Sequence, residues 1–522
     1  MNHSKTRIAP ILTIAAIALL ACTGPAQALA QGPSQPALSQ HAQAAPLPLS
    51  GRAGNSGSVT AIEAPIAGTT NSVTTINPSV QVQGPYTGSA SSTARLPFAG
   101  ELSLRDAIQR GLNFNLGTAN LNRAVNQAQG QSQIARSALL PNVSGYLAEN
   151  LAQTNLAAQG LRIHIPIPGF NFPTIVGPYN NIDLRGSVSQ SVLDLTAWNN
   201  FRASNEQVHA AQLSARDARD AVVLAVCGEY LQIIATKERV ASAHAQLDTA
   251  TALLQQTQQK RAVGLAPQID VDRSEVEQLT QQQRVISLET ELSKQKIALA
   301  RITGLPPNDA YDLTDEVPFA AAPTLILDDA IHQALDRRSD IKAAEAQVRA
   351  AQRALAAAHD ERLPSLSVNG NYGSIGTNPA QASATFSAAA TLSIPIWQGG
   401  RTEGDIKVAQ AALAQRQSEL DDLKGQVESD VRNAFLDLQA ATSQVKLAQR
   451  NLQVNQETLD LTRQRFDAGV TDNVEVVQAQ ESLSSANLDV INSVFADNLA
   501  KLSLARAIAS AADNLQQFLN LQ

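Results

Sequence analysis

Residues 203–265 read ASNEQVHAAQLSARDARDAVVLAVCGEYLQIIATKERVASAHAQLDTATALLQQTQQKRAVGL. Before the closing RAVGL there is no proline and a single glycine, Gly228, while Ala, Gln, Leu, Arg and Glu dominate, as an uninterrupted helix requires. At ~1.5 Å per residue, roughly sixty residues form a rod about 90 Å long, far longer than helices of ordinary globular domains. The glycine of RAVGL predicts a tight turn, after which a second helix runs back to about Leu299. We therefore expect a long helical hairpin that acts as a spacer or a wall.

The same pattern occurs a second time between residues 405 and 511. The turn of this second hairpin contains Gly469, which follows Gly264 by 205 residues. An earlier segment also repeats, because LSLRDAI from Leu102 and LILDDAI from Leu325 are 223 residues apart. The sequence therefore predicts a duplicated helical hairpin as the frame of the protein.

Four segments have a period of two instead of a helical period. Residues 182–192, 366–372 and 386–396 alternate apolar side chains with polar or small ones, and residues 142–151 form a weaker partner. An isolated hairpin of this kind usually belongs to an ordinary solvated sheet. Strands of about ten residues in a chain with a signal sequence also match the wall of an outer-membrane barrel. The outer face of such a wall is apolar toward lipid, and its inner face is polar toward a water-filled lumen.

The barrel interpretation makes two further predictions. Leu392, Ile394 and Ile396 of the last strand are expected to face outer-membrane lipid. Four strands cannot close a barrel around an aqueous lumen, so several copies of the chain would share one barrel as a symmetric homo-oligomer.

Residues 1–30 have a basic start, a short apolar run and small residues after it, which predicts a secretory signal peptide. Two processing sites are open. The letters LLAC resemble a lipoprotein-processing motif in which Cys22 is acylated, whereas Ala28 to Ala30 fits ordinary cleavage before Gln31.

The remaining chain divides into further predicted regions. Residues 31–99 are rich in Pro, Gly, Ser, Thr, Ala and Gln and predict a low-complexity, mostly disordered leader. Ser103 is the expected N-cap of the first helix. The expected regions after the leader are a first repeat at 100–304, a connector at 305–324, a second repeat at 325–511 and a C-terminal tail at 512–522.

Composition excludes several classes of function. The 522 residues are 44% hydrophobic but only 4% aromatic, which favours thin layers of Ala-rich helices over several thick cores. The net charge of −7 is spread along the helices without a basic run, so nucleic acid is not expected as a partner.

No constellation for catalysis or metal binding is visible in the sequence. The seven histidines have no pair at zinc-ligand spacing, and no phosphate-binding Gly-Lys-Ser/Thr loop is present. Cys227, in the middle of the long helix, is expected to be a small buried apolar residue. We therefore expect neither an enzyme nor a cofactor.

Taken in order, these segments resemble the TolC-like outer-membrane efflux proteins from about Leu102 to Ala511. The resemblance is carried by Leu-x-Leu-x-Asp-Ala-Ile, by the Leu-Pro-x-x-Ser step into each first strand, and by the turns VGL at 263–265 and FDAG at 466–469. It implies a mainly α fold with a small β part. Three chains would contribute four strands each to one transmembrane β-barrel, and their hairpins would continue it as a periplasmic α-barrel.

The resemblance also implies partners and site residues. The chain would be the passive exit duct of a tripartite efflux or type I secretion system, in the cell outer membrane, served by a periplasmic adaptor and an inner-membrane transporter. The positions that match the family's adaptor-docking helix ends are Val263, Gly264, Leu265, Gly469 and Thr471. The positions that match its periplasmic gate are Asp270, Glu475 and Gln478.

Alternatives stay open for these assignments. Gly264 and Gly469 are also what two helix C-caps require, and each charged gate position also fits a solvated helix face. The competing function is a structural coiled-coil or adhesin-like surface protein, with the helices as a stalk and the strands as a solvated head.

Overall fold

The computed structural model describes residues 58–66, 75–90, 100–158, 160, 173–307, 310–315, 318–320, 325–468, 470–471, 473–511 and 518–519. The predicted signal peptide, Cys22 and Gly469 lie outside these ranges.

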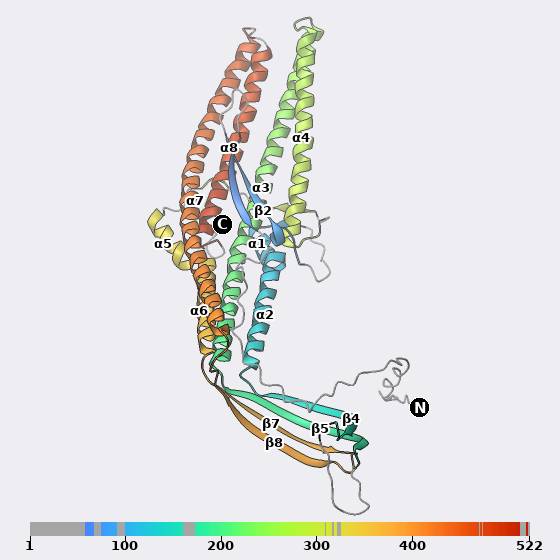
Figure 1. The fold of residues 1–522 in the computed structure, drawn as a ribbon. Helices are drawn as coiled ribbons and strands as arrows, with labels where there is room; N and C mark the ends of the chain where they lie inside the picture. Colours follow the sequence, from blue (N-terminus) through green and yellow to red (C-terminus); the bar gives the residue numbers. More distant parts are fainter. Residues whose placement is uncertain are drawn as a thin grey trace, which may run out of the picture. The chain divides into compact units, whose positions relative to one another are not determined.

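The first repeat places a short strand, two helices and two long strands before its long hairpin (Figure 1). Its elements are β3 (Gly100–Leu102), α1 (Leu104–Phe114), α2 (Leu116–Ser137), β4 (Asn142–Asn155), β5 (Ile175–Leu193), α3 (Leu195–Ala262) and α4 (Gln268–Thr303).

The second repeat has the same order of elements. They are β6 (Tyr311–Leu313), α5 (Leu327–Arg337), α6 (Ser339–Asp360), β7 (Ser365–Gly376), β8 (Ser383–Ser393), α7 (Arg401–Asp467) and α8 (Asn473–Ala507). We call α3 and α4 the first hairpin, and α7 and α8 the second hairpin. The predicted duplication of long helical hairpins is confirmed.

Local polar contacts explain where the first helices begin. Ser103 caps α1, because its hydroxyl accepts a hydrogen bond from the backbone N–H of Asp106 at 3.1 Å. Asn115 ends α1 and caps α2, with its side-chain oxygen 2.8 Å from the backbone nitrogen of Gly117. The predicted N-cap at Ser103 is confirmed.

The four long strands form one antiparallel sheet in the order β4-β5-β7-β8. Strand register places Tyr372 opposite Phe386 and Leu366 opposite Leu392 on one face, which is mainly apolar. The other face is polar, with the Ser144 and Ser187 hydroxyls 2.7 Å apart. The predicted two-faced sheet is therefore confirmed.

The last strand is shorter than its alternation predicts. β8 ends at Ser393, so Ile394 and Ile396 follow the strand instead of belonging to it, and Pro395 between them has no N–H for a sheet hydrogen bond. Ile396 is 96% exposed and Trp397 87% exposed in this segment. The extension of the strand to residue 396 was wrong.

The main hydrophobic core includes the region where α3 packs against α8. Val226, Cys227 and Tyr230 of α3 belong to it, together with Leu499 and Leu502 of α8. Cys227 is fully buried, as predicted, and burial raises the pKa of its thiol.

The predicted leader is not structureless. Within it, β1 (Val59–Ile66) pairs antiparallel with β2 (Thr75–Val82), and the short helix η1 (Gly84–Thr87) follows. Val80 and Val82 of β2 pack against the main core, which gives this segment apolar burial that its composition did not suggest. The prediction of disorder was wrong for these residues.

A small parallel pair joins the two repeats. β3 pairs with β6, whose residues lie in the predicted connector.

None of the helices in the described part of the chain combines the length and the apolarity that crossing a membrane requires.

Candidate functional site

The end of the first hairpin is a tight glycine turn with exposed apolar side chains. Gly264 has a φ of +78°, and the backbone N–H of Leu265 donates to the carbonyl of Lys260 at 2.7 Å. Val263 is 70% exposed and Leu265 78% exposed. The turn therefore presents two adjacent apolar side chains that its own chain does not cover.

The second hairpin ends similarly. The backbone N–H of Val470 donates to the carbonyl of Arg465 at 2.9 Å, and the Val470 side chain is 68% exposed. Thr471 is half-buried beside it. Val470 was missed by sequence reasoning, although its place after Ala468 mirrors that of Leu265 after Val263.

A contact between the hairpins lies next to these turns. Lys260, in the last turn of α3, places its ammonium 3.8 Å from the ring centroid of Phe466, in the last turn of α7. This is cation–π geometry. The sequence placed Phe466 in the turn motif but gave no sign of its partner.

Each candidate gate carboxylate has a basic neighbour in its own chain. Glu475 lies 3.6 Å from Arg465 across the second turn, and Asp270 lies 3.7 Å from Arg273. Gln478 is exposed on α8. Arg465 therefore supplies a positive charge beside Glu475.

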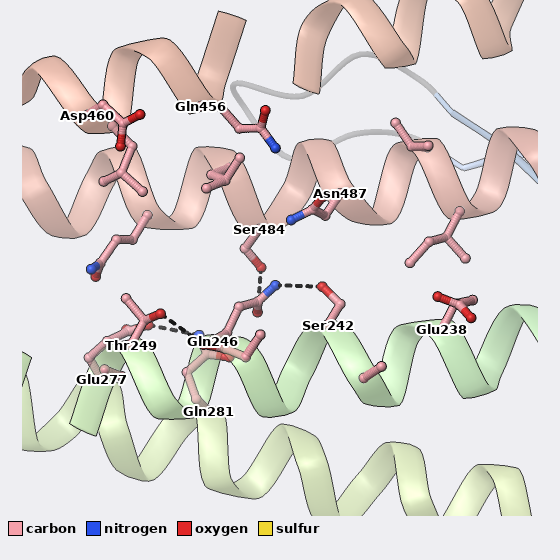
Figure 2. A pocket seen from close by; sticks show the side chains of 18 of the residues that line it. Glu238, Ser242, Gln246, Thr249, Glu277, Gln281, Gln456, Asp460, Ser484 and Asn487 are labelled. Atoms are coloured by element: carbon pink, nitrogen blue, oxygen red, sulfur yellow. Dashed lines mark hydrogen bonds between the residues drawn. The ribbon is translucent and has the colours of Figure 1, made fainter. Parts of the chain in front are cut away.

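A cleft of about 590 Å³ separates the two hairpins behind their ends (Figure 2). All four long helices line it, and most of the side chains are polar. Those labelled in Figure 2 are Glu238, Ser242, Gln246, Thr249, Glu277, Gln281, Gln456, Asp460, Ser484 and Asn487.

Hydrogen bonds cross this cleft at one level. The Ser484 hydroxyl of α8 donates to the Gln246 side-chain oxygen of α3 at 2.8 Å, and Arg284 of α4 donates to Ser484 at 3.1 Å. Nearer the core, Arg239 donates to the Asn492 side-chain oxygen at 2.6 Å. The contacts between the hairpins are thus apolar near the core and include hydrogen bonds along the polar cleft.

The sheet offers a second candidate surface for transport. Its polar face is held by side-chain hydrogen bonds, including Asn371 to Ser387 at 2.7 Å. Its apolar face leaves Phe386 80% exposed in the single chain. One polar and one apolar face are the arrangement that a barrel wall between lipid and water requires.

The described residues contain no cluster of three or more His, Cys, Asp or Glu side chains placed to hold a metal ion. The arrangement provides a polar sheet face, a polar cleft between the hairpins and exposed apolar side chains at the hairpin ends.

Comparison with known proteins gives consistent matches. The family model described as outer membrane efflux protein matches residues 109–305 and 330–510. Outer membrane protein TolC of Vibrio cholerae is 23% identical over 387 residues, which cover 73% of this chain and 84% of that protein. Outer membrane protein OprJ of Pseudomonas aeruginosa is 25% identical over 440 residues, which cover 80% and 86% respectively.

Solved structures show the same fold. The CmeC outer membrane channel of Campylobacter jejuni superposes with a TM-score of 0.69 at 16% identity, over 89% of this chain and 99% of that one.

Proposed function

Because the chain belongs to the outer membrane efflux protein family, we propose that it forms the outer-membrane exit duct of a three-component export assembly. The chain is an outer-membrane efflux channel whose long helices extend into the periplasm, and its activity is transport without catalysis. The observation that carries the proposal is the two-faced sheet joined to duplicated hairpins.

We propose a homotrimer as the functional form. β4 and β8 are the two edges of the four-stranded sheet, and neither has a second strand partner within the described chain. Open edges are normally paired or covered, and four strands are too few for an aqueous lumen. Three copies would close the edges into one barrel of twelve strands and would place the apolar faces against outer-membrane lipid.

We propose that the hairpin ends dock a periplasmic adaptor protein, which in turn recruits an inner-membrane transporter. Exposed Val263 and Leu265 at the first turn and Val470 at the second support this role, because burial of apolar side chains by a partner is favourable. The proposed docking residues are Val263, Gly264, Leu265, Gly469 and Thr471, to which Val470 is added by its exposure.

We propose Asp270, Glu475 and Gln478 as gate residues. Threefold symmetry would repeat each of them around the tunnel axis, where carboxylates attract cations and repel one another. Arg465 would temper that repulsion within each chain, since its guanidinium lies beside Glu475. The gate would then be closed by contacts between helix ends, and the carboxylates would set its preference for cations.

The coiled-coil stalk remains a poorer account of the sheet. A solvated head has no need of the exposed Phe386 and Leu392 on one face.

Adaptor docking is tested by photo-crosslinking in cells. A benzophenone amino acid at position 265 should crosslink to a periplasmic protein and retain an inner-membrane transporter on purification. The same amino acid at Leu447, an exposed position of α7 about twenty residues before its end, should not. An assembled outer-membrane protein that gives no crosslink from position 265 would contradict the docking proposal.

Two further measurements test the assembly and the processing of the chain. Native mass spectrometry of the same preparation checks for three chains. Mass spectrometry of the mature N-terminus decides between acylated Cys22 and free Gln31.

A further inference from the structure

The segment before the family-matched residues contacts both repeats. We call residues 58–66 and 75–90 the leader bridge; they precede residue 109, where the family match begins. Both of its strands contact α3 of the first repeat and α8 of the second, and η1 contacts α2 and α4. The bridge therefore spans the junction between the two hairpins.

The bridge is fitted into a notch on α3. Gly228, the only glycine in this helix of 68 residues, lies under Val80 of β2. A Cβ added at Gly228 would stand 2.3 Å from a γ-carbon of Val80 and 2.9 Å from its β-carbon, which is closer than such atoms approach. Glycine inside a helix is less stabilising than alanine, so the helix is less stable at this position, where the bridge needs space.

A second notch receives the end of the bridge. A Cβ at Gly117 of α2 would stand within 2.5 Å of the Tyr86 ring, and Tyr86 itself is buried. The Asn115 side-chain amide donates to the Tyr86 carbonyl at 2.8 Å, and the backbone N–H of Leu116 donates to the Gly88 carbonyl at 2.8 Å. The bridge is thus held by shape and by hydrogen bonds at its C-terminal end.

The bridge lies where the packing of the hairpins changes character. Just beyond Gly228, Leu231 and Ile234 of α3 line a cavity of about 330 Å³ together with Phe495 of α8. That cavity shares Glu238 with the larger polar cleft, which extends toward the hairpin ends. Past this level, hydrogen bonds join α8 to the first hairpin from Ser484 and Asn492. Polar contacts of this kind separate more easily than packed apolar side chains.

We propose that the leader bridge is a clamp that holds α8 against α3 at the base of the cleft and confines separation of the hairpins to the part beyond it. With the bridge docked, the hairpins bend apart only on the side of their ends. With the bridge released, separation spreads toward the strands and the channel opens more often. This inference rests on the proposed function, because it assumes that the hairpins move apart when the proposed gate opens.

The sharpest variant is Gly228→Ala, examined in the full chain reconstituted in lipid nanodiscs. It favours the helix itself, so any loosening comes from displaced Val80 and not from a weakened α3. Gly425→Ala in α7 is the matched control, because nothing lies within 4 Å of a Cβ at that position. A second variant, Val80→Gly, empties the notch from the other side, and combining it with Gly228→Ala restores space for the added methyl group.

Docking is measured by chymotrypsin cleavage after Tyr86, the only aromatic residue of the bridge. We expect Gly228→Ala and Val80→Gly to be cut about tenfold faster than the wild type, which corresponds to about 1.4 kcal/mol of local opening. The control and the combined variant should resemble the wild type. Protection of Tyr86 in Gly228→Ala would overturn the assigned fit of Val80 into the notch.

Clamping is measured separately, by crosslinking cysteines placed at Glu238 of α3 and Val490 of α8, which line the base of the cleft, with a short bismaleimide. We expect released variants to lose at least half of the crosslink and to show a higher open probability in single-channel records. Release of Tyr86 with unchanged crosslinking would overturn the clamp. Lost crosslinking with unchanged open probability would overturn the link to opening while leaving the exit-duct function intact.

Discussion

The Lys260 ammonium lies 3.8 Å from the ring centroid of Phe466, so a side chain of the first hairpin covers an aromatic face of the second at their ends. Cation–π contacts of this kind contribute about 0.5–2 kcal/mol. We expect Phe466→Leu, which keeps the apolar bulk but removes the ring, to increase amide hydrogen exchange in the last turns of α3 and α7. A double-mutant cycle with Lys260→Gln should give a coupling of that size; strictly additive effects would show that the two side chains act independently.

Ion preference depends on the pair formed by Arg465 and Glu475. Glu475→Gln should lower the preference of the resting channel for cations, and Arg465→Gln should raise it, because the first removes a carboxylate and the second its counter-charge. Reversal potentials in planar bilayers under a salt gradient measure both changes. Unchanged preference in both variants would place this pair on a solvated outer face and move the gate elsewhere.

The apolar face of β8 gives a matched test of membrane contact. Ala388 and Ser387 are neighbours near the middle of the strand and point to opposite faces. Ala388→Asp should reduce the amount of assembled protein in the outer membrane, since a carboxylate facing lipid costs up to a few kcal/mol. Ser387→Asp, on the polar face, should assemble normally. Equal assembly of both variants would argue that the face of Ala388 does not meet lipid.

Glu229, half-buried on α3, should make stability depend on pH. Burial raises its pKa to about 7, from an ordinary value of 4.5. The folded chain therefore holds this proton over a range in which the unfolded chain has lost it, and stability falls as pH rises from about 4.5 to about 7, then stays level. Glu229→Gln should remove this dependence and raise stability at pH 8 by about 1–3 kcal/mol. Unfolding midpoints at pH 5 and pH 8 measure it, with the exposed Glu238→Gln as control.

A buried ion pair in α8 is expected to be essential for stability. Lys501 and Asp497 are fully buried with 2.6 Å between ammonium and carboxylate, and Lys501 also donates to the carbonyl of Ala320 in the connector. Asp497→Ala should cost about 3–5 kcal/mol, because it leaves a buried ammonium without its counter-charge. The combined Asp497→Leu and Lys501→Met variant should cost much less than the two single changes together.

Denaturant unfolding followed by circular dichroism measures these costs. The exposed pair of Arg432 and Glu428 is the control, for which Arg432→Gln should cost less than about 1 kcal/mol. A similar small cost for Asp497→Ala would contradict the burial argument.

Much of this fold could be predicted from the sequence, because its helices and strands have local periodic patterns. A helix of 68 residues and strands with two faces repeat every few residues, so their period identifies them without knowledge of partners. Contacts between distant residues leave no such period. Neither Lys260 with Phe466 nor β3 with β6 could be found from spacing, because both join segments about two hundred residues apart.

The sequence holds two weak indications of the leader bridge, but the Pro-, Gly- and Ser-rich composition of the leader favoured disorder instead. Val80 and Val82 alternate with polar neighbours, and Gly228 interrupts an otherwise glycine-free helix. Either feature alone is common, and only their contact in space connects them. The end of β8 was missed for a different reason. Ile394 and Ile396 continue the alternation on either side of Pro395, although the strand ends at Ser393.

Asp315 ties the beginning of the first repeat to a residue made much later. Its carboxylate accepts from the backbone N–H of Leu104 at 2.6 Å and lies 2.8 Å from the Tyr230 hydroxyl, which is also 2.9 Å from the carbonyl of Leu102. A chain that enters the periplasm from its N-terminus therefore cannot complete the first repeat until residue 315 has been exported. Until then the start of α1 and the buried Tyr230 hydroxyl lack this partner, so the order of export sets the order in which the two repeats can finish folding.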